Sequence, residues 1–150
     1  MKRLTALLLV LSALLAAPAV SQGFRLEGLD GSSLSQEALE SGDWVIVVWA
    51  SWSPRARDIG PRIDALAGEL SGRARVCGVH FQDTPAEVRK SLGAQRPDAP
   101  LYVDARGDFS KKYQVSDLPS LLILRQGRVV HKGRLTADPV SVASPLLGTS

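Results

Sequence analysis

The feature that most restricts the fold of this chain is an uninterrupted run of large apolar residues from Trp44 to Trp49, with the sequence WVIVVW. Its β-branched and aromatic residues favour a strand, and the lack of polar alternation indicates that both faces of the strand are covered. Such central strands are typical of α/β sheets. The chain has 150 residues, the length of one ordinary domain, and can bury a core without a metal or a disulfide.

A helix is expected directly after this strand. Its apolar residues repeat with helical spacing: Ile59, Ile63, Leu66, Ala67 and Leu70. Ser53 followed by Pro54 predicts the helix start, with Ser53 as N-cap, Pro54 at the first helical position and Arg55 in the first turn. Pro61 then falls inside the helix and is expected to kink it.

The rest of the chain alternates between extended and helical patterns. Strands are expected at 24–26, 33–34, 75–81, 101–103, 120–124 and 129–132. Helices are expected at 36–39, 84–93, 109–113 and from Asp138 onward, the second of them opened by a capping box at Thr84 and Glu87. This order predicts one α/β domain with a mixed central β-sheet flanked by helices on both faces.

The first nineteen residues have the pattern of a secretory signal peptide. Lys2 and Arg3 precede an apolar run from Leu7 to Ala19, which ends in the small residues Ala17-Pro18-Ala19. We therefore expect a signal peptide at 1–19, a domain at 20–150, and a periplasmic or extracellular location. The alternative is an uncleaved N-terminal anchor, without which no stable membrane span is expected.

The net charge of +3 gives no support to a nucleic-acid partner. Removing Lys2 and Arg3 from the 18 basic residues leaves 16 against 15 acidic ones, so residues 20–150 carry +1. A nucleic-acid-binding protein usually has a basic stripe, and this remainder has none.

Cys77 is the only cysteine, so no disulfide can form within the chain. It lies in the apolar segment 76–79, where a free thiol usually behaves as a small buried hydrophobic group. The alternative is an exposed thiol that pairs with another chain. His80 and His131 lack metal-ligand spacing, and we expect neither a metal nor a cofactor.

The segment from Trp49 to Ala56, WASWSPRA, resembles the active-site segment of the thioredoxin superfamily, in which WAxWCxxC lies at a strand-to-helix turn. Pro61 matches the proline that kinks the active-site helix in that superfamily, and Leu118-Pro119-Ser120 resembles its cis-proline loop. The resemblance extends from about Phe24 to Leu147 and is strongest to the exported TlpA/ResA-like branch. It implies a thioredoxin-like fold and a cis peptide bond before Pro119.

The chain departs from this superfamily at the residues that carry its chemistry. Ser53 and Ala56 occupy the two cysteine positions, and Val47 occupies the position of a buried carboxylate found in many thioredoxins. A serine hydroxyl is too weak an acid to ionise near neutral pH and cannot form a mixed disulfide. We therefore predict a thioredoxin-like protein that is redox-inactive, with no catalytic residues.

The substituted loop still resembles a peptide-binding surface. The predicted binding residues are Trp52, Ser53, Pro54, Arg55, Leu118 and Pro119. Exposed aromatics and arginines are favoured as binding anchors, and the cis-proline loop of the superfamily offers backbone groups to an extended chain. A protein or peptide partner is the preferred hypothesis.

Three other functions stay open at this point. Thiol-disulfide oxidoreductase activity would have to use Cys77 together with an external thiol. A hydrolase would need Ser53 as nucleophile, with a base that no motif supplies. The domain would otherwise serve as a subunit or spacer without a binding groove.

Overall fold

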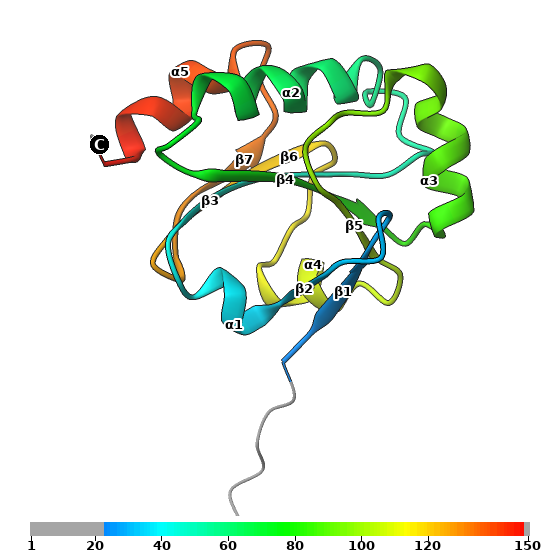
Figure 1. Cartoon of the computed structure of the whole chain (residues 1–150), viewed down its shortest axis with the longest axis horizontal. Helices are drawn as coiled ribbons and strands as arrows, with labels where there is room; N and C mark the ends of the chain where they lie inside the picture. Colours follow the sequence, from blue (N-terminus) through cyan, green and yellow to red (C-terminus); the bar gives the residue numbers. More distant parts are fainter. Residues whose placement is uncertain (1–22, 149–150) are drawn as a thin grey trace, which may run out of the picture.

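The computed structural model describes residues 23–148, which form a seven-stranded mixed sheet with the order β2-β1-β5-β4-β3-β6-β7 (Figure 1). The strands are β1 (Arg25–Gly28), β2 (Ser33–Ser35), β3 (Asp43–Trp49), β4 (Arg75–Phe81), β5 (Leu101–Asp104), β6 (Ser120–Arg125) and β7 (Arg128–Arg134). β4 pairs in parallel with β3 and β5, whereas β6 pairs antiparallel with β3 and β7. The predicted signal peptide at 1–19 lies outside the described residues.

Helices cover both faces of the sheet, as the sequence predicts. On one face lie α2 (Ile59–Glu69), α3 (Pro85–Leu92) and α5 (Pro139–Ala143), and on the other lie α1 (Gln36–Leu39) and α4 (Asp108–Lys112) (Figure 1). Short 3-10 turns follow α3 and α5, at Gly93–Gln95 and Ser144–Leu146. No helix within residues 23–148 has the length and apolar character needed to cross a membrane.

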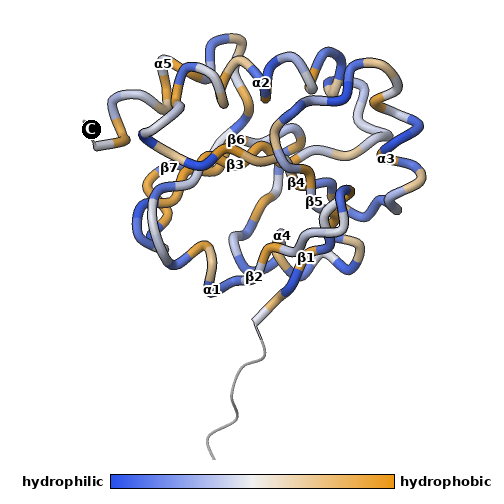
Figure 2. The backbone as a smooth tube through the Cα atoms, viewed as in Figure 1, coloured by the Kyte–Doolittle hydropathy of each residue, from blue (hydrophilic) through white to orange (hydrophobic). Residues whose placement is uncertain are grey.

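The sheet divides the core into two apolar layers, and β3 contributes to both. Val45, Val47 and Trp49 pack under α2, α3 and α5, while Ile46 and Val48 pack against the α1 and α4 side. Apolar residues are concentrated along the central strands (Figure 2). The lack of polar alternation in this strand is therefore explained by burial on both faces.

The helix after β3 begins later than the sequence predicts. Residues 51–58 form turns, and α2 starts at Ile59 with Asp58 as its N-cap in the left-handed region (φ 54°). The N–H of Ala56 donates to the carbonyl of Ser53 at 3.1 Å. Pro54 is therefore the second residue of a four-residue turn, a position that proline favours as strongly as the first position of a helix. The expectation that Ser53 caps the helix and that Arg55 lies in its first turn is wrong.

This later start also corrects the role of Pro61. Pro61 is the third residue of α2, where a backbone N–H has no acceptor within the helix. The missing N–H of proline removes no helical hydrogen bond there, so the expected kink has no cause.

Gly78 on β4 provides the space for the largest buried ring of the core. A Cβ atom on Gly78 would lie 2.6 Å from Cη2 of Trp49 and 2.7 Å from Cδ2 of Leu101, both shorter than any ordinary contact. The indole therefore rests directly on the backbone of β4. The orientation of Trp49 at the end of β3 depends on this glycine.

We predict that Gly78→Ala lowers the free energy of unfolding by about 1–3 kcal/mol, because overpacking displaces Trp49 or the backbone of β4. Urea unfolding measures the effect. Gly68→Ala is the matched control: a Cβ on Gly68 in α2 meets no atom within 4 Å, and alanine there should stabilise by about 0.5–1 kcal/mol. Equal stabilities of the two variants would contradict this packing.

Candidate functional site

The site lies at the edge of the sheet where three strand ends meet. β3 and β4 are parallel and both finish at this edge, with Trp49 opposite His80. β6 runs antiparallel to β3 and begins here, with Ser120 opposite Val48. The loop after β3, the loop after β4 and the segment before β6 are therefore neighbours, although they are far apart in the sequence.

Successive turns shape the loop after β3. The N–H of Ser53 donates to the carbonyl of Ala50 at 3.1 Å, and the next turn joins Ser53 to Ala56. Ser53 is buried and Ala56 is half-buried. By contrast Trp52 has 63% of its side chain exposed, the largest exposure of any large apolar residue in the described chain. The loop thus turns an aromatic side chain outward next to Ser53.

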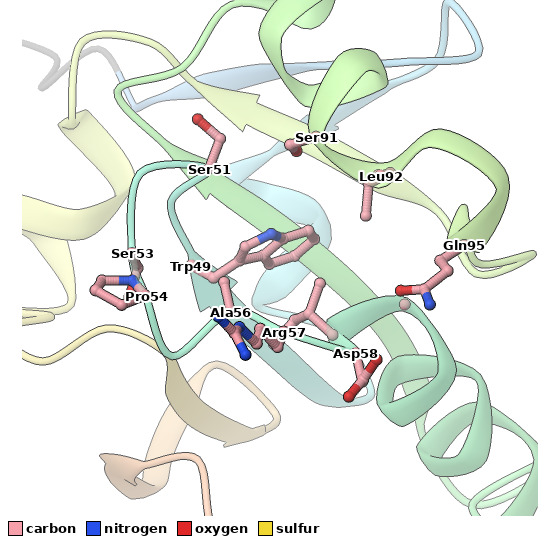
Figure 3. A pocket seen from close by; sticks show the side chains of 12 residues that line it. Trp49, Ser51, Ser53, Pro54, Ala56, Arg57, Asp58, Ser91, Leu92 and Gln95 are labelled. Carbon is pink, nitrogen blue, oxygen red and sulfur yellow. The ribbon is translucent and has the colours of Figure 1, made fainter.

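One cavity of about 380 Å³ lies between this loop and α3 (Figure 3). The indole of Trp49 lies between the loop and the helix, with Ser53 and Ala56 on the loop side and Ser91 and Leu92 on the α3 side. Pro54 also lines it. The cavity is thus bordered by both residues that the resemblance places at the cysteine positions of the superfamily.

A second cavity, of about 500 Å³, lies near the segment before β6 and brings together Arg55 and Pro119. The Leu118–Pro119 peptide bond is cis. Leu118 is half-buried and packs against the core layer of α1 and α4. Neither Trp52 nor Leu118 lines these two cavities. The six predicted binding residues therefore share one edge of the sheet but not one cavity. Two of them line each cavity, Trp52 is exposed, and Leu118 packs against the core.

A buried hydrogen-bond network that sequence reasoning missed anchors the loop. The N–H and the hydroxyl of Ser51 donate to the carboxylate of Asp83 at 2.8 and 2.7 Å. Nδ1 of His80 lies 3.1 Å from Oδ2 of the same carboxylate, and both side chains are buried. The only sequence signal is that Ser51 and Asp83 each follow a strand that ends at this edge.

Burial keeps His80 neutral. Loss of solvation lowers the pKa of His80 from 6.5 to about 4, and the hydrogen bond and charge of Asp83 offset only part of that effect. A carboxylate only accepts hydrogen bonds, so the contact with Asp83 assigns the proton to Nδ1 of His80. Its Nε2 is then a bare acceptor, without a hydrogen-bond partner in the described chain, and the ring centre lies 3.8 Å from that of Trp49.

The network does not have the geometry of a hydrolase. Asp83 lies between the serine and the histidine, so His80 does not contact the Ser51 hydroxyl as a base must. The hydroxyl of Ser53 has no side-chain partner in the described residues. β3 and β6 separate His131 on β7 from His80 on β4. Residues 23–148 hold no group of three or more metal-ligating side chains.

Cys77 lies away from the loop. It is fully buried in the core layer of α1 and α4, whereas Trp49 and the loop cavity belong to the opposite face. Burial raises the pKa of Cys77 to about 12. The thiolate form that reacts with disulfides is therefore nearly absent at neutral pH.

We predict that His80 makes the fold acid-sensitive. Between about pH 6.5 and 4, His80 is protonated in the unfolded chain but stays neutral in the folded one. The free energy of unfolding therefore falls as pH falls, by roughly 1 kcal/mol per pH unit. His80→Asn keeps a donor toward Asp83 and should lose this pH dependence of the free energy of unfolding, which urea titrations at several pH values measure. His131→Asn is the control and should match the wild type. Coincident profiles for all three proteins would contradict a neutral buried His80.

The comparisons with known proteins agree with this architecture. A family model described as the AhpC/TSA family matches residues 17–136. A thioredoxin of Thiocapsa roseopersicina is 28% identical over 98 residues, which cover 65% of this chain and 84% of that protein. A thioredoxin-like protein of Haemophilus influenzae is 25% identical over 105 residues, covering 69% of this chain but only 62% of the relative's length.

Among solved structures, the exposed lipoprotein thioredoxin of Streptococcus pneumoniae is similar, with a TM-score of 0.71 and 20% identity. The match covers 83% of this chain and 97% of that one. The predicted membership in the thioredoxin-like superfamily is confirmed. The chain belongs to the AhpC/TSA family and has the thioredoxin-like fold.

Proposed function

We propose that this chain is an exported thioredoxin-like protein that performs no thiol–disulfide exchange and binds an extended protein or peptide segment at the former active site. One observation carries the proposal. The fold keeps the exposed Trp52 and the cis Leu118–Pro119 bond around a loop in which Ser53 and Ala56 replace both cysteines.

The missing sulfur atoms support redox inactivity. Exchange begins when a thiolate attacks a disulfide, and the resulting mixed disulfide is resolved by a second thiol. Ser53 supplies neither the nucleophile nor the sulfur, and Ala56 supplies no resolving group. Cys77, the alternative thiol, is enclosed on the far side of the sheet with its pKa raised to about 12. No described feature favours its use in exchange.

The exposed indole supports binding. A tryptophan with 63% of its side chain in solvent loses the hydrophobic free energy that burial would give, and the core places its other two tryptophans inside. Tryptophan is also enriched among residues that dominate binding interfaces. Contact with a partner accounts for the position of Trp52 better than packing does.

Free backbone groups beside Pro119 support an extended ligand. The carbonyl of Pro119 accepts from the N–H of Leu135 at 2.9 Å, but Leu118 makes no backbone hydrogen bond with another described residue. Its N–H and C=O are one donor and one acceptor at the edge of the site. An extended peptide satisfies such a pair by strand-like pairing, which requires no cysteine.

Export is part of the proposal. The predicted signal peptide at 1–19 supports it. The similar pneumococcal protein is described as an exposed lipoprotein. A periplasmic or extracellular location would place the binding surface among other exported proteins.

Introducing two cysteines at positions 53 and 56 tests whether their absence explains the proposed redox inactivity. We predict that Ser53→Cys/Ala56→Cys forms an internal disulfide, because the turn at 53–56 holds these two residues close together. The variant should then catalyse insulin reduction by dithiothreitol, while the wild type stays at the uncatalysed rate. Mass spectrometry detects the loss of two hydrogen atoms on oxidation.

The single variants Ser53→Cys and Ala56→Cys are the controls, and neither should form the internal bond. Two thiols that never pair under oxidation would contradict the loop geometry. Insulin reduction by the wild type well above the blank would refute redox inactivity.

Removing the exposed indole of Trp52 tests the proposed binding of an extended peptide. A displayed library of extended peptides is selected on the wild-type protein, and enriched peptides are measured by fluorescence anisotropy. We predict that Trp52→Ala weakens their binding about tenfold or more. Val129→Ala, which truncates an exposed apolar residue on β7, should leave the affinity unchanged. Selection that enriches no peptide, or equal losses in both variants, would argue against a binding surface at Trp52.

A further inference from the structure

The cavity beside Pro119 gathers four arginines from two separate parts of the chain. Arg55 and Arg57 come from the loop after β3, Arg62 from α2 and Arg134 from the end of β7. We call this cavity of about 500 Å³ the arginine hollow. Three of these arginines lie within residues 55–62, and the fold brings the distant Arg134 beside them.

Little negative charge balances these arginines. Asp58 is the only carboxylate among the lining residues, and it makes no side-chain hydrogen bond to the helix end that it precedes. Within residues 23–148, neither Arg55 nor Arg57 has a carboxylate within 4 Å. Arg134 lies 3.8 Å from Asp117, but both side chains are more than half exposed, so this pair is weak.

Arg62 has a structural contact that the others lack. Its Nη2 donates to the carbonyl of Thr136, which follows β7, and its side chain is half-buried. The guanidinium is therefore held in place at the wall of the hollow. Arg55 and Arg57 are exposed and free to reach a ligand.

The remaining lining residues are apolar and lie beside the free backbone of Leu118. They are Pro119, Leu135 and Ala137. Convergent like charges without counter-charges destabilise a fold through repulsion, and an anionic ligand removes that cost. Guanidinium groups bind carboxylates through paired hydrogen bonds. The hollow thus combines cationic, apolar and backbone-pairing groups in one place.

We propose that the arginine hollow selects acidic segments, so that the ligand of this protein is an extended peptide with glutamate or aspartate side chains. The inference rests on the proposed peptide-binding function and names its substrate class. A peptide fits better than another polyanion because Leu118 offers strand-like pairing that only a polypeptide backbone satisfies. The wider charge balance agrees, since residues 20–150 carry only +1 and the positive charge is local.

The test compares two labelled peptides of one extended sequence, with glutamate or glutamine at alternate positions that share one face. Fluorescence anisotropy measures both at low salt. We expect the glutamate peptide to bind about tenfold more tightly, and its advantage to shrink between 10 and 150 mM NaCl as the Debye length shortens from about 30 to about 8 Å.

Variants locate the effect in the hollow. Arg55→Gln/Arg134→Gln should remove most of the preference for glutamate while the glutamine peptide still binds. Arg128→Gln/Lys132→Gln removes the same charge from other exposed positions on β7 and should keep the preference. Arg62 is left intact because of its bond to Thr136, and thermal melts by circular dichroism verify that each variant folds.

The possible failures are distinguishable. Equal binding of the two peptides, both weakened by Trp52→Ala, would overturn the acidic preference and leave the peptide-binding function standing. Absence of binding by either peptide would overturn both. Inorganic polyphosphate is the competitor. If it displaces the glutamate peptide and depends on Arg55 and Arg134 to the same degree, the hollow binds polyanions in general and the proposed preference for a peptide is overturned.

Discussion

Burial of β3 on both faces is the constraint on which the rest of this molecule depends. A strand covered on both sides must lie inside the sheet, and here it has β4 on one side in parallel and β6 on the other in antiparallel pairing. Parallel neighbours end at the same edge, and an antiparallel neighbour begins there. Strand direction therefore places Ser51, Asp83 and Pro119 at one edge of the sheet, the kind of edge where ligands bind in other open α/β sheets.

The loop at that edge is held at both ends and exposed in the middle. The carboxylate of Asp83 accepts two hydrogen bonds from Ser51 and a third from His80. At the other end, the left-handed turn at Asp58 directs the chain into α2. These anchors restrict both ends of the segment 52–57, which lowers the conformational entropy that a bound ligand would remove from it. The buried, half-satisfied His80 is the cost of this arrangement, because its Nε2 has no partner in the described chain.

Much of the fold follows from local sequence patterns, and the exceptions have physical reasons. The apolar run at β3 and the capping box at Thr84 are local signals, and both elements form where they predict. Ser53-Pro54 failed as a helix start because serine followed by proline suits a tight turn equally well. The Ser51–Asp83 contact joins residues 32 apart and depends on the register of β3 against β4, which no local pattern contains. The arginine hollow depends on residues 55–62 lying beside the end of β7, so no local sequence pattern predicts it.

The absence of a cysteine pair changes which contacts would hold a partner at this edge of the sheet. A catalytic thioredoxin holds its substrate through a mixed disulfide, so its non-covalent contacts need only orient the two sulfur atoms. Under the proposed function this chain forms no mixed disulfide, so the lifetime of a complex would depend wholly on non-covalent contacts. Large apolar anchors prolong such complexes, whereas exposed charged groups speed the encounter and select the partner. Trp52 would supply such an anchor and the arginine hollow such charges, and both lie at the edge of the sheet that carries Ser53 and Ala56.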